Sequence, residues 1–232
     1  MISPRFLMPI LVTIGLFDPS YHAYAASPDI WYDNEEPTEF SLYVRRVKTI
    51  LDDSQPDIET ATEWAGVSWF YYLQPNIEAG LFGGYSFSSQ TGYSRTAGMN
   101  LNGAHAGLAL RIHMLKRQNL DVHLTGNYTY QNVDDELNSQ LENFVWHQFD
   151  AGLAADVQLS RGIGLHAAII YGRITGTETA TGPINRTVNF NHDADTGGVI
   201  GINFLSGEDG LIGIRAHAGL NEGGEIIFTR LY

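Results

Sequence analysis

A regular alternation of apolar and polar residues constrains the fold of this chain more than any other feature. Between residues 120 and 131 the two kinds of side chain take strict turns. One set is Leu120, Val122, Leu124, Gly126, Tyr128 and Tyr130, and the other is Asp121, His123, Thr125, Asn127, Thr129 and Gln131. Because successive side chains of a β-strand point to opposite faces, this pattern predicts a strand with one apolar and one polar face.

The same alternation returns at residues 77–87, 104–113, 149–159 and 212–220. In most of these segments the polar side also holds glycine or alanine, with a few charged residues. A water-soluble sandwich would carry long polar side chains there, whereas the inside of a narrow barrel has room mainly for small ones. The apolar side, edged with aromatic residues, suits contact with lipid. The pattern therefore favours a transmembrane barrel.

The connections between the predicted strands alternate in length, as the short periplasmic turns and longer outer loops of bacterial barrels do. Short turns are expected near residues 74–76, 116–118, 160–162 and 206–209. Longer polar loops are expected near residues 52–59, 88–97, 132–143 and 176–191, and the last outer connection, 221–224, is a short exception.

The segments add up to about ten strands, an even number that keeps both ends of the barrel in the periplasm. They are residues 39–51, 61–73, 77–87, 98–114, 120–131, 144–159, 163–175, 192–205, 211–220 and 225–232. The first segment alternates poorly and carries a basic cluster, so an eight-stranded barrel is the alternative. We predict an all-β fold: an antiparallel, up-and-down transmembrane β-barrel over residues 39–232.

The N-terminal sequence indicates a targeting segment. Arg5 precedes an apolar run at residues 6–17, and a polar stretch then ends in Ala23-Tyr24-Ala25. This order predicts a signal peptide at residues 1–25, because the run is shorter than the ~20 residues that span a bilayer. Residues 26–38 are polar and hold two prolines. We expect them to form a periplasmic segment, either a linker or a docking site for a periplasmic or surface protein.

Composition excludes some classes of function. The formal charge of −13 argues against nucleic acid as a partner. The chain has no cysteine, so neither disulfides nor thiolate metal sites are available. Beyond the first segment no apolar run reaches spanning length, so a membrane location requires a barrel.

The C-terminal segment, residues 225–232, ends in Tyr232 with Phe228 and Ile226 at alternate positions before it. Together with the signal peptide and the hairpin rhythm, it makes the mature chain resemble the small Gram-negative outer-membrane barrels of the opacity and omptin kind. Arg230 departs from that C-terminal pattern. The resemblance implies an outer-membrane location, with lipid, lipopolysaccharide and the barrel-assembly machinery as partners. The machinery would read Ile226, Phe228 and Tyr232 as an assembly signal.

The polar faces carry histidines, carboxylates and arginines near the predicted periplasmic ends of the strands. If the short turns are centred as described, His113 lies opposite Asp121, Arg111 opposite His123, and Asp156 opposite His166. The predicted luminal polar network is Arg111, His113, Asp121, His123, Asp156, His166, Arg215 and His217. His113, Asp121, Asp156 and His166 are also candidate catalytic residues, because a carboxylate can orient an imidazole for acid–base chemistry. Mutual pairing inside a narrow lumen is the simpler interpretation.

We therefore expect a narrow, polar, plugged lumen and a structural, adhesive or anchoring role without catalysis. A small-solute channel and an outer-membrane hydrolase using His–Asp pairs are the alternatives. No cofactor is expected. No metal is expected either, because His105 with His113, and His192 with Asp193 and Asp195, lack a second converging set of ligands. The aromatic residues at 64–72, 146 and 149 are interpreted as interfacial anchors.

Overall fold

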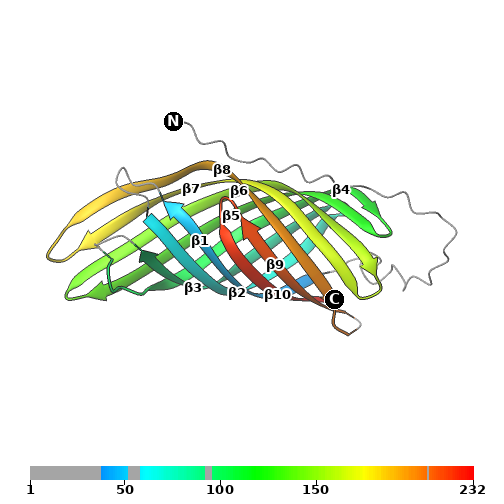
Figure 1. Ribbon diagram of the computed structural model, residues 1–232, viewed down its shortest axis with the longest axis horizontal. Coiled ribbons are helices and arrows are strands. Elements are labelled where there is room, and N and C mark those ends of the chain that lie inside the picture. Colours follow the sequence, from blue (N-terminus) through cyan, green and yellow to red (C-terminus); the bar gives the residue numbers. More distant parts are fainter. Residues whose placement is uncertain (1–37, 52–57, 92–95, 208) are drawn as a thin grey trace, which may run out of the picture.

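The computed structural model describes residues 38–51, 58–91, 96–207 and 209–232. They form ten antiparallel strands in one closed barrel, in which every strand pairs with its neighbours in sequence and β1 pairs with β10. The chain is thus an up-and-down barrel, and the ten-strand count is confirmed (Figure 1). No helix in the described ranges is long and apolar enough to cross a membrane. The predicted signal peptide and residues 26–37 lie outside the described residues.

The strands are longest in the middle of the sequence and shortest at its end. They are β1 (Glu39–Leu51), β2 (Ile58–Gln74), β3 (Ile77–Thr91), β4 (Leu101–Arg117), β5 (Leu120–Leu137), β6 (Gln140–Ser160), β7 (Ile163–Thr181), β8 (Arg186–Leu205), β9 (Gly210–Ala218) and β10 (Glu222–Leu231). By the rule for bacterial barrels, the end at which β1 begins and β10 ends is the periplasmic end, and the other is the outer end.

The outer wall of the barrel is apolar, as the alternation predicts. Large hydrophobic side chains that face outward and are exposed include Leu42, Val44, Trp69, Leu81, Leu108, Leu124, Leu153, Ile169, Ile200, Ile214 and Phe228. A closed sheet satisfies all its backbone hydrogen bonds internally, so such a wall is stable in lipid and would be insoluble in water. The chain is a small outer-membrane β-barrel, and the outer membrane is its location.

The basic cluster of β1 fits the barrel because its side chains diverge. Arg45 points into the lumen, where its guanidinium lies 4.8 Å from the ring centroid of Trp64. Arg46 and Lys48 point outward and pair with carboxylates of β2, Glu63 at 3.4 Å and Glu59 at 2.7 Å. These pairs lie toward the outer end of β1, so the first segment is a full strand of the barrel.

Two predicted loops are instead strand. β5 and β6 continue to a two-residue turn at Asn138 and Ser139, both with positive φ (54° and 65°). β7 and β8 likewise continue to a short turn at residues 182–185. The loop predictions at 132–143 and 176–191 are therefore wrong. Above the lipid, water faces the outer side of a hairpin, so the apolar half of the alternation is no longer needed there.

The rim of the barrel is uneven at the outer end. β9 and β10 are short, and β8 pairs with β9 only from Gly198 onward. The β7–β8 hairpin and the β5–β6 hairpin rise well beyond them on the other side (Figure 1). The barrel thus has a tall wall, which includes β5 to β8, and a low wall formed by β9 and β10.

Candidate functional site

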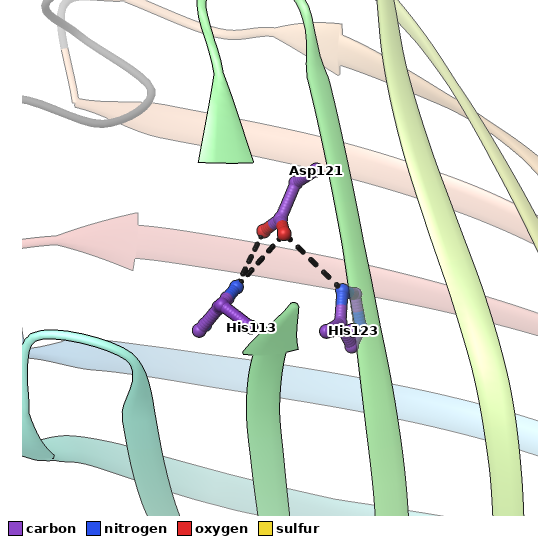
Figure 2. A group of neighbouring side chains, drawn as sticks. All are labelled: His113, Asp121 and His123. Carbon is purple, nitrogen blue, oxygen red and sulfur yellow. Dashed lines mark hydrogen bonds and ion pairs between the residues drawn. The ribbon is translucent and has the colours of Figure 1, made fainter. Parts of the chain in front are cut away.

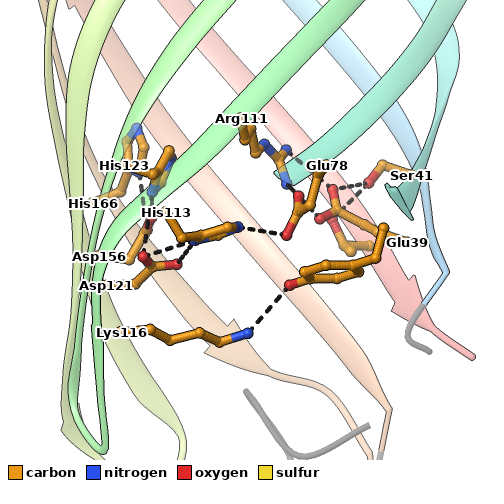
Figure 3. Close-up of polar contacts among 12 residues, drawn as sticks. Glu39, Ser41, Glu78, Arg111, His113, Lys116, Asp121, His123, Asp156 and His166 are labelled. Atoms are coloured by element: carbon orange, nitrogen blue, oxygen red, sulfur yellow. Dashed lines mark hydrogen bonds and ion pairs between the residues drawn. The ribbon is translucent and has the colours of Figure 1, made fainter. Parts of the chain in front are cut away.

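The periplasmic half of the lumen holds a chain of ion pairs that we call the luminal charge network. Its members lie on six strands and all point inward (Figure 3). They are Glu39, Glu78, Arg111, His113, Asp121, His123, Asp156 and His166. Sequence reasoning found six of the eight, and it missed Glu39 and Glu78.

Arg111 on β4 links two other strands of the barrel. Its Nη1 lies 2.8 Å from Oε2 of Glu39 on β1 and 3.1 Å from Oε2 of Glu78 on β3. The guanidinium also lies 3.7 Å from the ring centroid of Phe70. Because β1 and β4 are not neighbours in the wall, the Arg111–Glu39 pair crosses the lumen.

His113 lies between two carboxylates. Its Nε2 is 2.8 Å from Oε1 of Glu78, and its Nδ1 is 2.7 Å from Oδ2 of Asp121. The predicted contact between His113 and Asp121 is present, but the predicted register is wrong, because His113 pairs with His123 and Arg111 with Thr125. The turn is centred on Gln118 and Asn119, and an irregularity between His113 and Leu115 shifts the strands further.

The far side of the network is a histidine–aspartate pair. Asp156 lies opposite His166 in the register, as predicted, and its Oδ1 is 2.9 Å from the imidazole Nδ1. Nδ1 of His123 lies 3.8 Å from Asp121 and 4.0 Å from Asp156. These distances are too long for hydrogen bonds, and the buried Nδ1 of His123 has no hydrogen-bond partner.

Arg215 and His217 do not join the ion pairs of the network. Their ion pairs within the described ranges are with Glu225 on β10, at 3.8 Å and 3.5 Å. Glu225 lies opposite Arg215 in the register, which explains the pairing. The predicted network is therefore two groups, one on β1 and β3 to β7 and one on β9 and β10.

Above the network, polar side chains hydrogen-bond across the lumen. Trp64 on β2 donates to Oε1 of Gln131 on β5 at 2.8 Å. The Tyr43 hydroxyl on β1 meets Nε2 of His105 on β4 at 2.5 Å, and Ser86 lies 2.9 Å from the other ring nitrogen of that histidine. The prediction that Trp64 and Trp146 anchor at the interface is wrong, since both are buried inside. Trp69, Tyr71 and Phe149 do face outward.

A hydrophobic cluster fills the inner side of the tall wall near the outer end. Its members are Leu101, Val133, Phe144, Trp146, Ile174 and Phe190, contributed by five successive strands. Still further out, Arg186 pairs with Glu142 at 3.3 Å and also with Glu178. Sequence analysis placed Val133, Phe190 and the three ion-pair residues in loops, and so could not assign them to the lumen.

A cavity of about 360 Å³ remains inside the barrel. Its walls include Tyr43, Arg45, Trp64, Asp150 and Glu225, and it also touches the charge network. The cavity also reaches Gly197 on β8 and, at the connection between β9 and β10, Leu220 and Asn221. This volume lies at the lower end of the range for small-molecule sites.

The arrangement offers acid–base groups but no nucleophile beside them. Among the described residues, the serine–histidine hydrogen bond is between Ser86 and His105, which makes Ser86 the candidate nucleophile to consider. Both are buried, and neither lines the cavity. The candidate catalytic residues His113, Asp121, Asp156 and His166 do come together, with carboxylate partners.

The predicted assembly signal lies on and just after β10. Ile226, Phe228 and Tyr232 are exposed, and the first two face outward. The guanidinium of Arg230 lies 5.1 Å from the ring centroid of Tyr232. This placement leaves the side chains accessible, and their role as a signal stays a prediction.

Comparison with known proteins gives a likeness of architecture. No family model and no curated protein matches the chain. Among solved structures, the outer-membrane protease OmpT from Escherichia coli is 9% identical with a TM-score of 0.47, covering 84% of this chain and 93% of its own. An outer-membrane channel from Pseudomonas putida F1 is 13% identical with a TM-score of 0.45, and the match covers 93% of this chain and 100% of the channel.

The attachment invasion locus protein Ail of Yersinia pestis is 7% identical with a TM-score of 0.43, covering 84% of this chain and 97% of its own. These three proteins are a protease, a channel and an attachment protein. At this level of similarity none of these activities transfers to the chain.

Proposed function

We propose that this protein is a closed-lumen outer-membrane barrel with a structural or adhesive role at the cell surface. The observation that carries the proposal is the set of side-chain bonds between strands that are not neighbours in the wall. Arg111–Glu39 and Tyr43–His105 join β1 to β4, and Trp64–Gln131 joins β2 to β5. Side chains that line an open aqueous pore would face water instead of one another.

The layers of the lumen act against ion flow in different ways. The charge network places bonded ionic side chains in the periplasmic half, and the hydrophobic cluster places apolar groups near the outer end. An ion that passes such an apolar layer loses its hydration without compensation. The described residues thus favour a barrel that does not conduct.

A surface role is supported by the tall hairpins. β5–β6 and β7–β8 form continuous ladders that rise beyond the low wall at the outer end (Figure 1). The upper part of β5 carries Asp134, Asp135 and Glu136, so this part of the wall is acidic. Hairpins stiffened by a full hydrogen-bond ladder lose little conformational entropy when they bind a partner.

Planar-bilayer recording tests the closed lumen. We expect the purified protein to give no stable large channels. Phe144→Ala combined with Trp146→Ala should introduce conductance, because it removes most of the apolar volume from the hydrophobic cluster. Ile200→Ala, on the outward face, is the matched control and should produce no conductance. Stable porin-like channels from the unaltered protein would overturn the proposal.

The surface role has its own test. A variant in which the hairpin tip, residues 134–143, is replaced by a two-residue Asn-Gly turn shortens the tall wall without reaching the lipid-facing band. Cells that carry this variant should insert the barrel normally and lose surface adhesion. Equal adhesion by cells with and without the tip would exclude the adhesive version and leave the structural one.

Small-solute binding is the second candidate, and the cavity is the observation that favours it. The cavity combines aromatic walls with Arg45, Asp150 and Glu225, the mixture that orients polar organic ligands. Uptake of radiolabelled sugars and amino acids into proteoliposomes would separate the two candidates. Saturable uptake that Trp64→Ala alters would favour a transporter, and absence of uptake would leave the closed barrel.

Assembly partners follow from the same proposal. We infer that lipid and lipopolysaccharide contact the apolar band, and that the barrel-assembly machinery reads the exposed side chains of β10. Phe228→Ala with Tyr232→Ala should slow insertion into membranes that contain the machinery. The variant should still fold in detergent, because both side chains lie on the exposed surface. Equal insertion rates would remove the assembly signal from this strand.

A further inference from the structure

His123 holds a buried ring nitrogen toward two carboxylates without bonding to either. Its side chain is 7% exposed, and its Nδ1 has no hydrogen-bond partner. The nearest acidic oxygens are Oδ1 of Asp121 at 3.8 Å and Oδ2 of Asp156 at 4.0 Å (Figure 2 shows the Asp121 side). A nitrogen held in this way is a donor atom available to a cation.

His113 approaches the same carboxylate from another side. Its Nδ1 faces Asp121 at 2.7 Å, while its Nε2 is fixed by Glu78 at 2.8 Å. Histidines that bind metals adopt this arrangement, in which one nitrogen meets the ion and the other donates to a carboxylate. Ligand atoms of His113, Asp121 and His123 all lie within 4.8 Å of one another.

Charge balance also leaves room for a cation. The network contains four carboxylates and one arginine, with three histidines between them. The carboxylates therefore outnumber the fixed positive charge of Arg111 by three, and a divalent cation would offset part of this excess. With such an ion bound, the Nδ1 lone pairs of His113 and His123 face it, and His123 gains the partner that it otherwise lacks.

We propose that the luminal charge network binds one divalent transition-metal ion of the Zn²⁺ class. Its ligands are Nδ1 of His113, Nδ1 of His123 and a carboxylate oxygen of Asp121, with Asp156 as the fourth donor. Bonds of about 2.0–2.2 Å place tetrahedral ligands roughly 3.4 Å apart. The Asp121 carboxylate lies 2.7 Å from Nδ1 of His113 and 3.8 Å from Nδ1 of His123, and Asp156 lies 4.0 Å from the latter. These distances lie on both sides of roughly 3.4 Å, so small side-chain rotations complete the site.

The chemistry of the donors selects the metal class. Two imidazoles with two carboxylates suit Zn²⁺ and neighbouring first-row ions. Ca²⁺ and Mg²⁺ prefer six or more oxygen ligands, which the two aspartates cannot supply. An ion here would tie β4, β5 and β6 together at the periplasmic end, independently of whether the lumen conducts.

The test uses untagged protein, treated with EDTA and held in detergent micelles. Calorimetric titration with Zn²⁺ should give one site per chain that excess Mg²⁺ or Ca²⁺ does not compete for. Co²⁺ should produce the visible absorption of a four-coordinate site. His123→Ala should weaken Zn²⁺ binding more than tenfold. Glu78→Gln, which replaces the carboxylate beside Nε2 of His113 with a neutral amide, should weaken it about tenfold or more. His147→Ala removes an imidazole from the outward face and is the matched control.

Heat-dependent gel mobility reports whether each variant forms a barrel, and His123→Gln replaces His123→Ala if the latter does not fold. Two results would overturn the proposal. One is the absence of saturable Zn²⁺ binding by the unaltered protein, and the other is equal affinity in a folded His123 variant. Bilayer recording on the same samples distinguishes this outcome from failure of the closed-lumen proposal.

Discussion

Trp64 on β2 donates its indole N–H to Oε1 of Gln131 on β5 at 2.8 Å, although β3 and β4 separate the two strands in the wall. Both side chains are buried, and Gln131 donates in turn to Ser88 at 3.3 Å. Neither group has ready access to water as an alternative partner. This bond therefore specifies how the lumen packs.

Trp64→Phe keeps an aromatic ring and removes the donor. It should lower the free energy of unfolding by about 1–3 kcal/mol, because the buried amide oxygen of Gln131 is then unsatisfied. The double variant Trp64→Phe with Gln131→Leu should lose less than the sum of the two single changes. Urea unfolding in lipid vesicles, followed by tryptophan fluorescence, measures both. Strict additivity would mean that the bond contributes nothing.

Arg111→Met should be one of the most damaging changes to a charged residue in the barrel. It leaves Glu39 and the buried Glu78 without their cation, and breaking a buried pair costs about 3–5 kcal/mol. Arg46→Met is the control, since its pair with Glu63 is exposed and contributes about 0–1 kcal/mol. Comparable unfolding curves for the two variants would contradict the structural importance of the network.

Two glycines offer a matched pair on neighbouring strands. A Cβ on Gly103 would collide with the backbone oxygen of Asn132 and with Cα of Val133, so Gly103→Ala should cost about 1–3 kcal/mol. Gly126→Ala should stay within about 0.5 kcal/mol, because a Cβ there meets nothing within 4 Å. The refolding yields and the urea midpoints of unfolding of the two variants measure this difference. A Gly126→Ala variant as unstable as Gly103→Ala would refute this account of the wall.

The β5–β6 turn is open to improvement. Asn138 and Ser139 both have positive φ, the geometry of the hairpin turn that Asn-Gly satisfies best. Ser139→Gly should stabilise the hairpin by up to about 1 kcal/mol, and Ser139→Val should destabilise it, since a β-branched residue resists this conformation. The rate of protease cleavage at the hairpin tip ranks the stability of the hairpin in the unaltered chain and in the two variants. Faster cleavage of the glycine variant than of the unaltered chain would rule out the turn assignment.

Local sequence pattern was enough to predict the apolar face of the clearly alternating strands, the approximate positions of the periplasmic turns and a barrel of about ten strands. These features depend on neighbours one or two residues apart, because the side-chain period of a strand is two. The pattern failed where the hairpins leave the lipid, at residues 132–143 and 176–191, because strands with water on their outer face need no apolar residues there.

The alternation from residue 120 to 131 therefore determined by itself that Asp121 and His123 point inward. It could not determine what they meet. That depends on strand tilt, on the register shift near Met114 and on closure of the sheet, which together bring Glu39 to Arg111 and Gln131 to Trp64 across the lumen. Contacts between strands that are far apart in the wall exist only once the barrel is closed, so the tertiary structure alone decided them.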